Sequence, residues 1–135
     1  MRTSLMLTAI ACLLGFTSLS HADQTIASPA IFGSLAQDRA RCLIGNLGTN
    51  SVSVDVNIFD ESGNIVPAST SCLSPVEPHF ICSVTATISA GAAYACSATT
   101  SGKAKNLRGT LVLTDRVLDG FGGSKDVPLR SAELR

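Results

Sequence analysis

Val52-Ser-Val-Asp-Val-Asn-Ile-Phe-Asp60 is the stretch of sequence that decides the fold. Apolar and polar residues alternate along it, and most of the apolar ones are β-branched, which is typical of a strand with one buried face. Glu61-Ser-Gly-Asn64 follows, and Ile65-Val66 resumes the apolar pattern. A Ser-Gly-Asn segment between two such runs indicates a hairpin turn. We therefore expect residues 52–66 to form a central hairpin of an all-β protein.

The first 22 residues have the pattern of a secretory signal peptide. Arg2 supplies the positive charge, and residues 5–16 form an apolar run that is too short to span a bilayer. Small residues at the end of this segment favour cleavage after Ala22. Cys12 would be the lipidated residue of a lipoprotein, but the apolar run continues past it. The sequence predicts an exported chain, periplasmic or extracellular, with one domain over residues 23–135 and no membrane span.

The composition argues against several classes of function. The chain has 10 Lys and Arg against 10 Asp and Glu and no basic patch, so nucleic acid is not expected as a partner. Its content of Ser, Thr, Gly, Ala and Val favours strands and turns over helices. The Gly-Phe-Gly-Gly run at 120–123 does not lie between a strand and a helix, so it does not match a phosphate-binding loop. No cofactor is expected.

Four cysteines follow the signal segment: Cys42, Cys72, Cys82 and Cys96. An even number in an exported chain predicts two disulfides, for which three connectivities exist. A zinc site is the weaker interpretation, because no pair has Cys-x2-Cys spacing. Loop entropy does not distinguish Cys42–Cys96 with Cys72–Cys82 from Cys42–Cys72 with Cys82–Cys96. Topology favours the first set, in which one bridge joins two core strands and the other closes a short loop that contains proline.

About seven strands are expected, separated by turns about every 8 to 12 residues. They are placed at residues 25–32, 39–47, 51–60, 64–67, 80–88, 92–99 and 107–114. Pro29 makes the first an edge or bulged strand. Residues 68–79 are expected to be a loop, and the tail to hold only a short run that ends at Leu129. The pattern predicts an antiparallel, immunoglobulin-like β-sandwich, with a small barrel as the alternative.

Two polar features are better explained by structure than by chemistry. His79 is the only histidine after the signal segment, and no nucleophile motif lies near it, so it is expected to be a loop residue. The turn Asp60–Asn64 superficially resembles a calcium loop, but it lacks the alternating oxygen ligands and the distal Glu. Asp, Gly and Asn are also the residues that a tight turn needs. We expect neither catalytic nor metal-binding residues.

The loop 119–124 is the candidate contact site, with Asp119, Phe121 and Ser124 as its contact residues. Its glycines would present Phe121 to a partner. The alternative is that Phe121 packs onto the core.

Three arginines would form a basic stripe if their strands were neighbours: Arg39, Arg41 and Arg108. Asp55 and Asp115 are expected to lie near enough to neutralise it. We therefore interpret these residues as parts of solvated faces.

Several segments share a layout with a known group of proteins. They are Cys42-Leu-Ile-Gly-Asn-Leu-Gly48, the alternating Val strand, the Asp60–Asn64 turn, Cys72-Leu-Ser-Pro75, Tyr94-Ala-Cys96 and Leu107-Arg-Gly-Thr-Leu-Val-Leu113. Behind an export signal, they resemble small exported bacterial proteins of unknown function with an immunoglobulin-like sandwich pattern and four cysteines. The resemblance covers residues 39–114. It implies a fold and no activity, and it lends no catalytic residues.

The sequence thus predicts a non-catalytic protein, a binding or structural module of the cell envelope or the extracellular space. A protein partner would bind an exposed edge strand, by β-augmentation, or the loop 119–124. One alternative is a fimbria-like appendage subunit assembled by strand exchange, with residues 25–32 as the detachable strand. Another is a small enzyme with a dispersed polar site.

Overall fold

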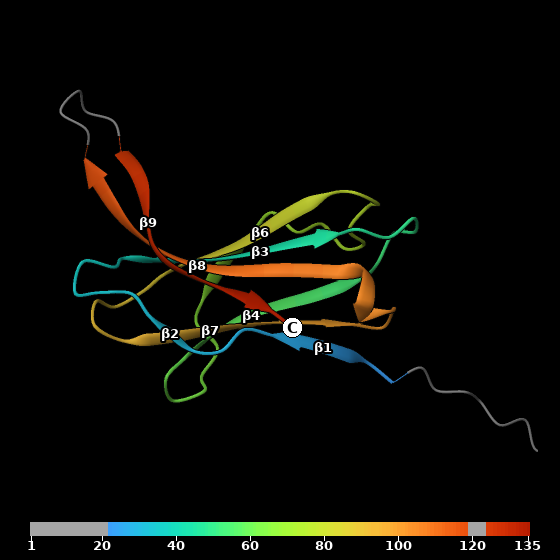
Figure 1. Cartoon of the computed structure of the whole chain (residues 1–135), viewed down its shortest axis with the longest axis horizontal. Helices are drawn as coiled ribbons and strands as arrows, with labels where there is room; N and C mark the ends of the chain where they lie inside the picture. Colours follow the sequence, from blue (N-terminus) through green and yellow to red (C-terminus); the bar gives the residue numbers. More distant parts are fainter. Residues whose placement is uncertain (1–21, 119–123) are drawn as a thin grey trace, which may run out of the picture.

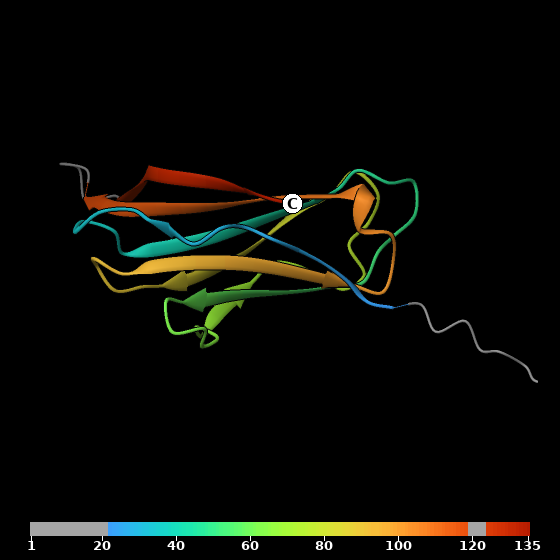
Figure 2. The ribbon, with the colours of Figure 1, turned by 60° about the horizontal axis from the view of Figure 1, so that its bottom comes forward.

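The computed structural model describes residues 22–118 and 124–135, which form two antiparallel sheets (Figures 1 and 2). Sheet A has β7 (Ala93–Thr100) at its centre, flanked by β1 (Gln24–Ala27), β2 (Ile31–Phe32) and β4 (Val54–Asp60). Sheet B runs in the order β5 (Ala68–Thr70), β6 (Ile81–Thr87), β3 (Arg39–Asn46), β8 (Leu107–Leu118), β9 (Ser124–Leu134). A 3-10 turn, η1 (Ala104–Asn106), precedes β8. The prediction of an all-β protein with antiparallel sheets is confirmed.

The alternating strands have the buried faces that their sequences predict. In β4, Val54 and Ile58 are buried and Asp55 is exposed. In β3, Cys42 and Ile44 are completely buried. The core lies between the inner faces of the two sheets, and the burial of these β-branched and aliphatic side chains supplies the main stabilisation.

Two disulfides hold this arrangement, and both follow the pairing that topology favoured. Cys42 in β3 is bonded to Cys96 in β7, with a Cα–Cα distance of 6.1 Å. Cys72 is bonded to Cys82, with a Cα–Cα distance of 4.8 Å. Both distances lie within the range of ordinary disulfides. The first bridge therefore links the central strands of the two sheets, and the second closes the loop between β5 and β6.

The first predicted strand is split in two at Pro29. β1 pairs with β7 from Gln24 to Ala27, and β2 pairs with it again at Ile31 and Phe32. β1 also contacts the other sheet, because Ala27 and Arg135 exchange two backbone hydrogen bonds of 3.1 Å each. The two sheets are therefore joined along this side.

The tail differs from the expected loop and short run. β8 continues to Leu118 and pairs with an eleven-residue strand, β9. Beyond Thr114 of β8, this hairpin extends past the neighbouring strands (Figure 1). The pairing skips Leu129, because Leu113 lies opposite Arg130 and Thr114 lies opposite Pro128. This bulge shifts the alternation, and Pro128 removes a backbone donor, which explains why the sequence pattern did not reveal the strand.

The sequence predicted that the hairpin at residues 52–66 would be central, and this prediction is wrong. Within the described chain, β4 is an edge strand of sheet A. Its outer edge is partly covered: Val66 donates to the carbonyl of Ile58 over 2.8 Å, and Val52 and Val76 exchange two hydrogen bonds. These contacts at both ends limit the capacity of β4 to accept a partner's strand.

Residues 68–79 are not wholly a loop. They begin with β5, a strand of three exposed residues at the edge of sheet B, which is too short and too polar to show an alternating pattern. The immunoglobulin-like detail of the fold stays a prediction. In constant-type immunoglobulin domains the last strand, G, lies in the same sheet as strand F, which carries one cysteine of the disulfide. Here β8, which follows β7, pairs with β3, and β1 lies beside β7.

Truncation of Ile58 tests which face of β4 is buried. Because Ile58 is completely buried, Ile58→Ala should lower the free energy of unfolding by about 2–5 kcal/mol. Asp55→Ala, on the exposed face of the same strand, should change it by about 0.5 kcal/mol or less. Chemical denaturation of both variants measures the difference. Equal effects of the two substitutions would contradict the assignment of the faces.

Candidate binding surface

The loop between β5 and β6 is fixed at three points. The Cys72–Cys82 disulfide ties its start to β6. Val76, near its middle, is paired with Val52 through hydrogen bonds of 2.8 and 3.0 Å. Near its end, the backbone N–H of His79 donates to the carbonyl of Asn46 over 2.7 Å. The loop is therefore held against the end of the sandwich.

Asn46 is the buried residue that organises these contacts. Its side-chain amide donates to the carbonyls of Asn50 and Val76 over 2.8 and 3.0 Å, and its side-chain oxygen accepts from Gly48 over 2.9 Å. Its backbone N–H donates to the carbonyl of Phe80 over 3.0 Å. Asn46 is fully buried, so these bonds satisfy a polar group that would otherwise be costly to bury. The role of Asn46 is structural, and no motif in the sequence marked it.

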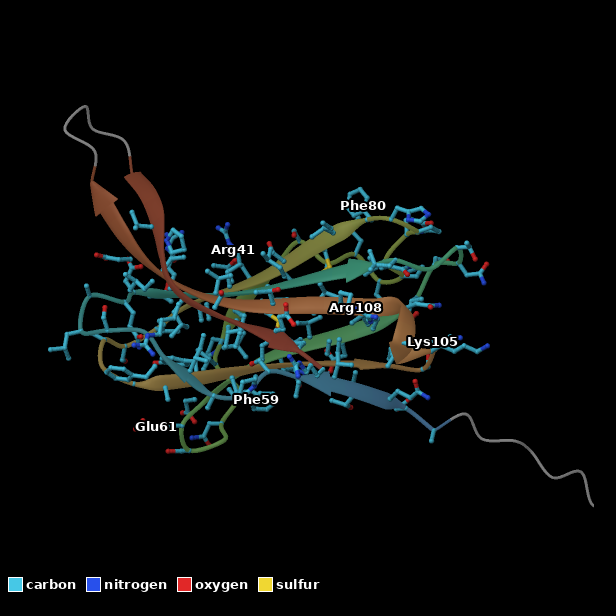
Figure 3. The ribbon with its side chains drawn as sticks, viewed as in Figure 1. Arg41, Phe59, Glu61, Phe80, Lys105 and Arg108 are labelled. Atoms are coloured by element: carbon cyan, nitrogen blue, oxygen red, sulfur yellow. A yellow bond between two sulfur atoms is a disulfide. The ribbon has the colours of Figure 1, made fainter. Side chains whose placement is uncertain are left out.

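Four large apolar side chains around this loop are exposed to solvent. Leu73 is 82% exposed, Ile81 67%, Phe80 60% and Leu47 59%. We call them the disulfide-side patch. The sequence placed Phe80 on one face with Cys82, which is buried, but Phe80 precedes the first residue of β6 and projects from the end of the sheet (Figure 3). Leu73 and Phe80 lie on the loop itself, Ile81 begins β6 and Leu47 follows β3. Single exposed apolar residues are common, whereas a group of them around a fixed loop is typical of an interaction site.

A shallow hollow of about 310 Å³ lies beside the patch. Leu73, Pro75, Val76 and Phe80 line it, and Glu77 is the only charged residue in its wall. This volume is near the lower end for a small-molecule site. The hollow is better suited to one apolar side chain of a partner with a cation beside it.

Of the contact residues chosen from the sequence, the structure describes only Ser124. Asp119 and Phe121 fall outside the described residues, as does the signal segment up to residue 21. Ser124 begins β9 opposite Leu118. Ser124 therefore lies at the far end of the β8–β9 hairpin, away from the start of β6 (Figure 1).

The basic stripe is formed in part. β3 and β8 are neighbours, and Arg39, Arg41 and Arg108 lie on the outer face of sheet B, opposite Thr114, Val112 and Gly45 respectively. The expectation that Asp55 would neutralise this face is wrong, because Asp55 belongs to β4 in the other sheet. Sequence spacing alone did not show that the two strands separate into different layers.

His79 and the Asp60–Asn64 turn shape the backbone. His79 adopts a positive φ of 60° at the entry to β6, and it is exposed. In the Asp60–Asn64 turn, Oδ1 of Asp60 accepts the backbone N–H groups of Ser62 and Asn64 over 2.9 and 2.8 Å, and Gly63 adopts a φ of 81°. Within residues 22–118 and 124–135, no group of three or more His, Cys, Asp or Glu side chains is arranged to hold a metal ion.

Comparison with protein-family models, with curated proteins and with solved structures finds no match. In the part of the chain that the structure describes, no helix is long and apolar enough to cross a membrane. The geometry defines a class, a small all-β protein of two antiparallel sheets held by two disulfides. Such bridges are typical of an oxidising compartment.

The pKa of Asp60 tests the chemistry of the turn. The backbone N–H of Asn64, followed by its side-chain amide, lowers the pKa of the Asp60 carboxyl below its ordinary value. The turn is therefore stabilised above the pKa of Asp60 in the unfolded chain, and this stabilisation is lost as the pH falls through the lower, folded pKa. Titration of the Asp60 carboxyl carbon by NMR should show a lowered midpoint. In Asn64→Ala the midpoint should move part of the way back. A midpoint at or above the ordinary value in the wild type would contradict this role.

Proposed function

We propose that this is an exported, non-catalytic β-sandwich that binds a protein partner through the disulfide-side patch. The observation that carries the proposal is the exposure of Leu73 and Phe80 on a loop that a disulfide and buried hydrogen bonds hold in place, with Ile81 exposed at the adjoining start of β6. A loop whose backbone is already held loses little backbone entropy on binding, and large apolar residues supply most of the affinity of protein interfaces.

Export is supported by two independent features. The first 22 residues have the charge and apolar run of a secretory signal. All four cysteines of the remaining chain are paired in disulfides, which persist in oxidising compartments.

The partner that we propose is a protein segment with apolar side chains and one basic residue. Its apolar side chains would cover Leu73 and Phe80 and enter the hollow between them. The basic residue would lie against Glu77, the charged residue of the hollow's wall. This combination gives an apolar centre with a charged rim, as in ordinary interfaces.

Site-specific crosslinking tests this proposal. A photoreactive residue in place of Phe80 should form an adduct with one protein in the producing cell, whereas the same residue in place of Glu61, at the turn after β4, should not (Figure 3). Leu73→Asp should reduce the adduct at least about tenfold, because it places a charge in the interface centre. Leu35→Asp is the matched control, since Leu35 is also 82% exposed but lies in the β2–β3 loop.

Three outcomes would contradict the proposal. The first is an equal adduct from both crosslinking positions, and the second is an adduct that Leu73→Asp leaves unchanged. The third is enzymatic turnover on a broad hydrolase panel that is lost when one polar side chain is replaced.

A second candidate function is an appendage subunit assembled by strand exchange, with β1 as the donated strand. It is supported by the position of β1, which is the first described strand, buries only Ile26 and is separated from β2 at Pro29. Exchange between copies predicts assembly that rises with concentration and rapid amide exchange in residues 25–32. A protein that stays monomeric at high concentration, with protected amides in that segment, would argue against it.

A further inference from the structure

A second hollow opens where β1 meets the ends of β8 and β9. β8 begins at Leu107, but its pairing with β9 begins only at Gly109, opposite Leu134. β1 lies alongside and is tied to β9 by the hydrogen bonds between Ala27 and Arg135. Between these elements lies a hollow of about 530 Å³, within the range of small-molecule sites. We call it the seam window.

Beside the seam window, β1 is also hydrogen-bonded to η1. Oε1 of Gln24 in β1 accepts the backbone N–H of Ala104, in η1, over 2.8 Å. The window is thus framed on one side by β1 and on the other by the start of β8, and β1 is hydrogen-bonded to Arg135 and to η1. These hydrogen bonds hold β1 beside the start of β8.

The floor of the seam window is apolar. Ile26, Leu107 and Leu134 line it, and they are only 8%, 1% and 4% exposed. They belong to the core of the sandwich. An aliphatic chain in the window would lie against the small part of these side chains that is exposed, and its affinity would come mainly from the burial of its own methylene groups.

The mouth of the seam window carries an excess of positive charge. Lys105, Arg108 and Arg135 lie around it, and Glu133 is the one acidic side chain that the described residues place in its wall. Glu133 is paired with Arg135 at 3.9 Å, and both side chains are largely exposed. Lys105 and Arg108, which lie at the same end of the molecule (Figure 3), are not balanced by another acid in that wall.

Arg108 is oriented by the backbone. Its Nη1 donates to the carbonyls of Lys105 and Leu107 over 2.9 and 2.7 Å. A guanidinium has five N–H donors, so these two bonds fix its plane and leave donors for a ligand. A carboxylate is well matched to such a group, because it accepts charge-assisted hydrogen bonds.

We propose that the seam window binds a single-chain aliphatic carboxylate, with its head on Arg108 and Lys105 and its tail on Ile26, Leu107 and Leu134. A neutral chain would leave the cations unused, and a cationic head would be repelled by them. A polyanion would meet Glu133 and only two uncompensated cations. This site is independent of the disulfide-side patch.

Titration of the full mature protein with sodium decanoate tests the proposal. Amide shifts followed by NMR should map to the ends of β1, β8 and β9, and the affinity should fall with added salt. Across a chain-length series, each added methylene should strengthen binding about fourfold until the floor is filled. Decanol and decyltrimethylammonium, which have the same chain without the anionic head, should bind at least about tenfold more weakly.

Charge-removing variants identify the head site. Arg108→Gln and Lys105→Gln should each weaken decanoate binding about tenfold. Arg130→Gln, an exposed cation of β9 outside the window, should leave it unchanged. Lys105 is an exposed residue of η1, so Lys105→Gln keeps the test informative if Arg108→Gln alters the fold.

Several results would overturn the proposal. They are the absence of binding at millimolar decanoate, equal binding of decanol, shifts that map away from the window, and unchanged affinity in both Gln variants. Vesicles of anionic lipid should not bind. Binding to vesicles in place of decanoate would assign the cations to a membrane surface instead.

Discussion

The Cys42–Cys96 bridge is the constraint on which the rest of the structure depends. It joins β3, in the middle of sheet B, to β7, in the middle of sheet A. Both cysteines are almost completely buried, so the bridge crosses the core where the apolar side chains of the two sheets meet. By closing a loop of more than fifty residues it also restricts the unfolded chain, which is worth about 4 kcal/mol.

Both proposed binding surfaces lie where strand pairing ends around this fixed centre. The disulfide-side patch lies at the start of β6, and the seam window lies where β9 stops short of the start of β8. At the patch, Leu73 and Phe80 are exposed just before β6 begins, whereas at the window Ile26, Leu107 and Leu134 remain almost completely buried. In each case a local tie holds them in place, the Cys72–Cys82 bridge at the patch and the Ala27–Arg135 pair at the window. Surfaces ordered in this way are suited to binding.

Local patterns predicted the strands and their faces, because alternation with a period of two needs no knowledge of distant segments. That holds for residues 39–46 and 54–60. β9 was missed because Pro128 and the bulge at Leu129 interrupt its alternation. The exposure of Phe80 depends on what covers the end of β6, which its own sequence does not contain. The seam window is built from segments at opposite ends of the chain, so no motif could reveal it.

Disulfide mapping of the unreduced protein by mass spectrometry tests the link between the two sheets most directly. Chymotrypsin suits the purpose, because its aromatic cleavage sites place each cysteine on a separate peptide: Phe59, Phe80 and Tyr94. The structure predicts one linked pair with Cys42 and Cys96, and a second with Cys72 and Cys82. A peptide pair that links Cys42 to Cys72 would contradict it, because β3 and β7 would then have no covalent connection across the core.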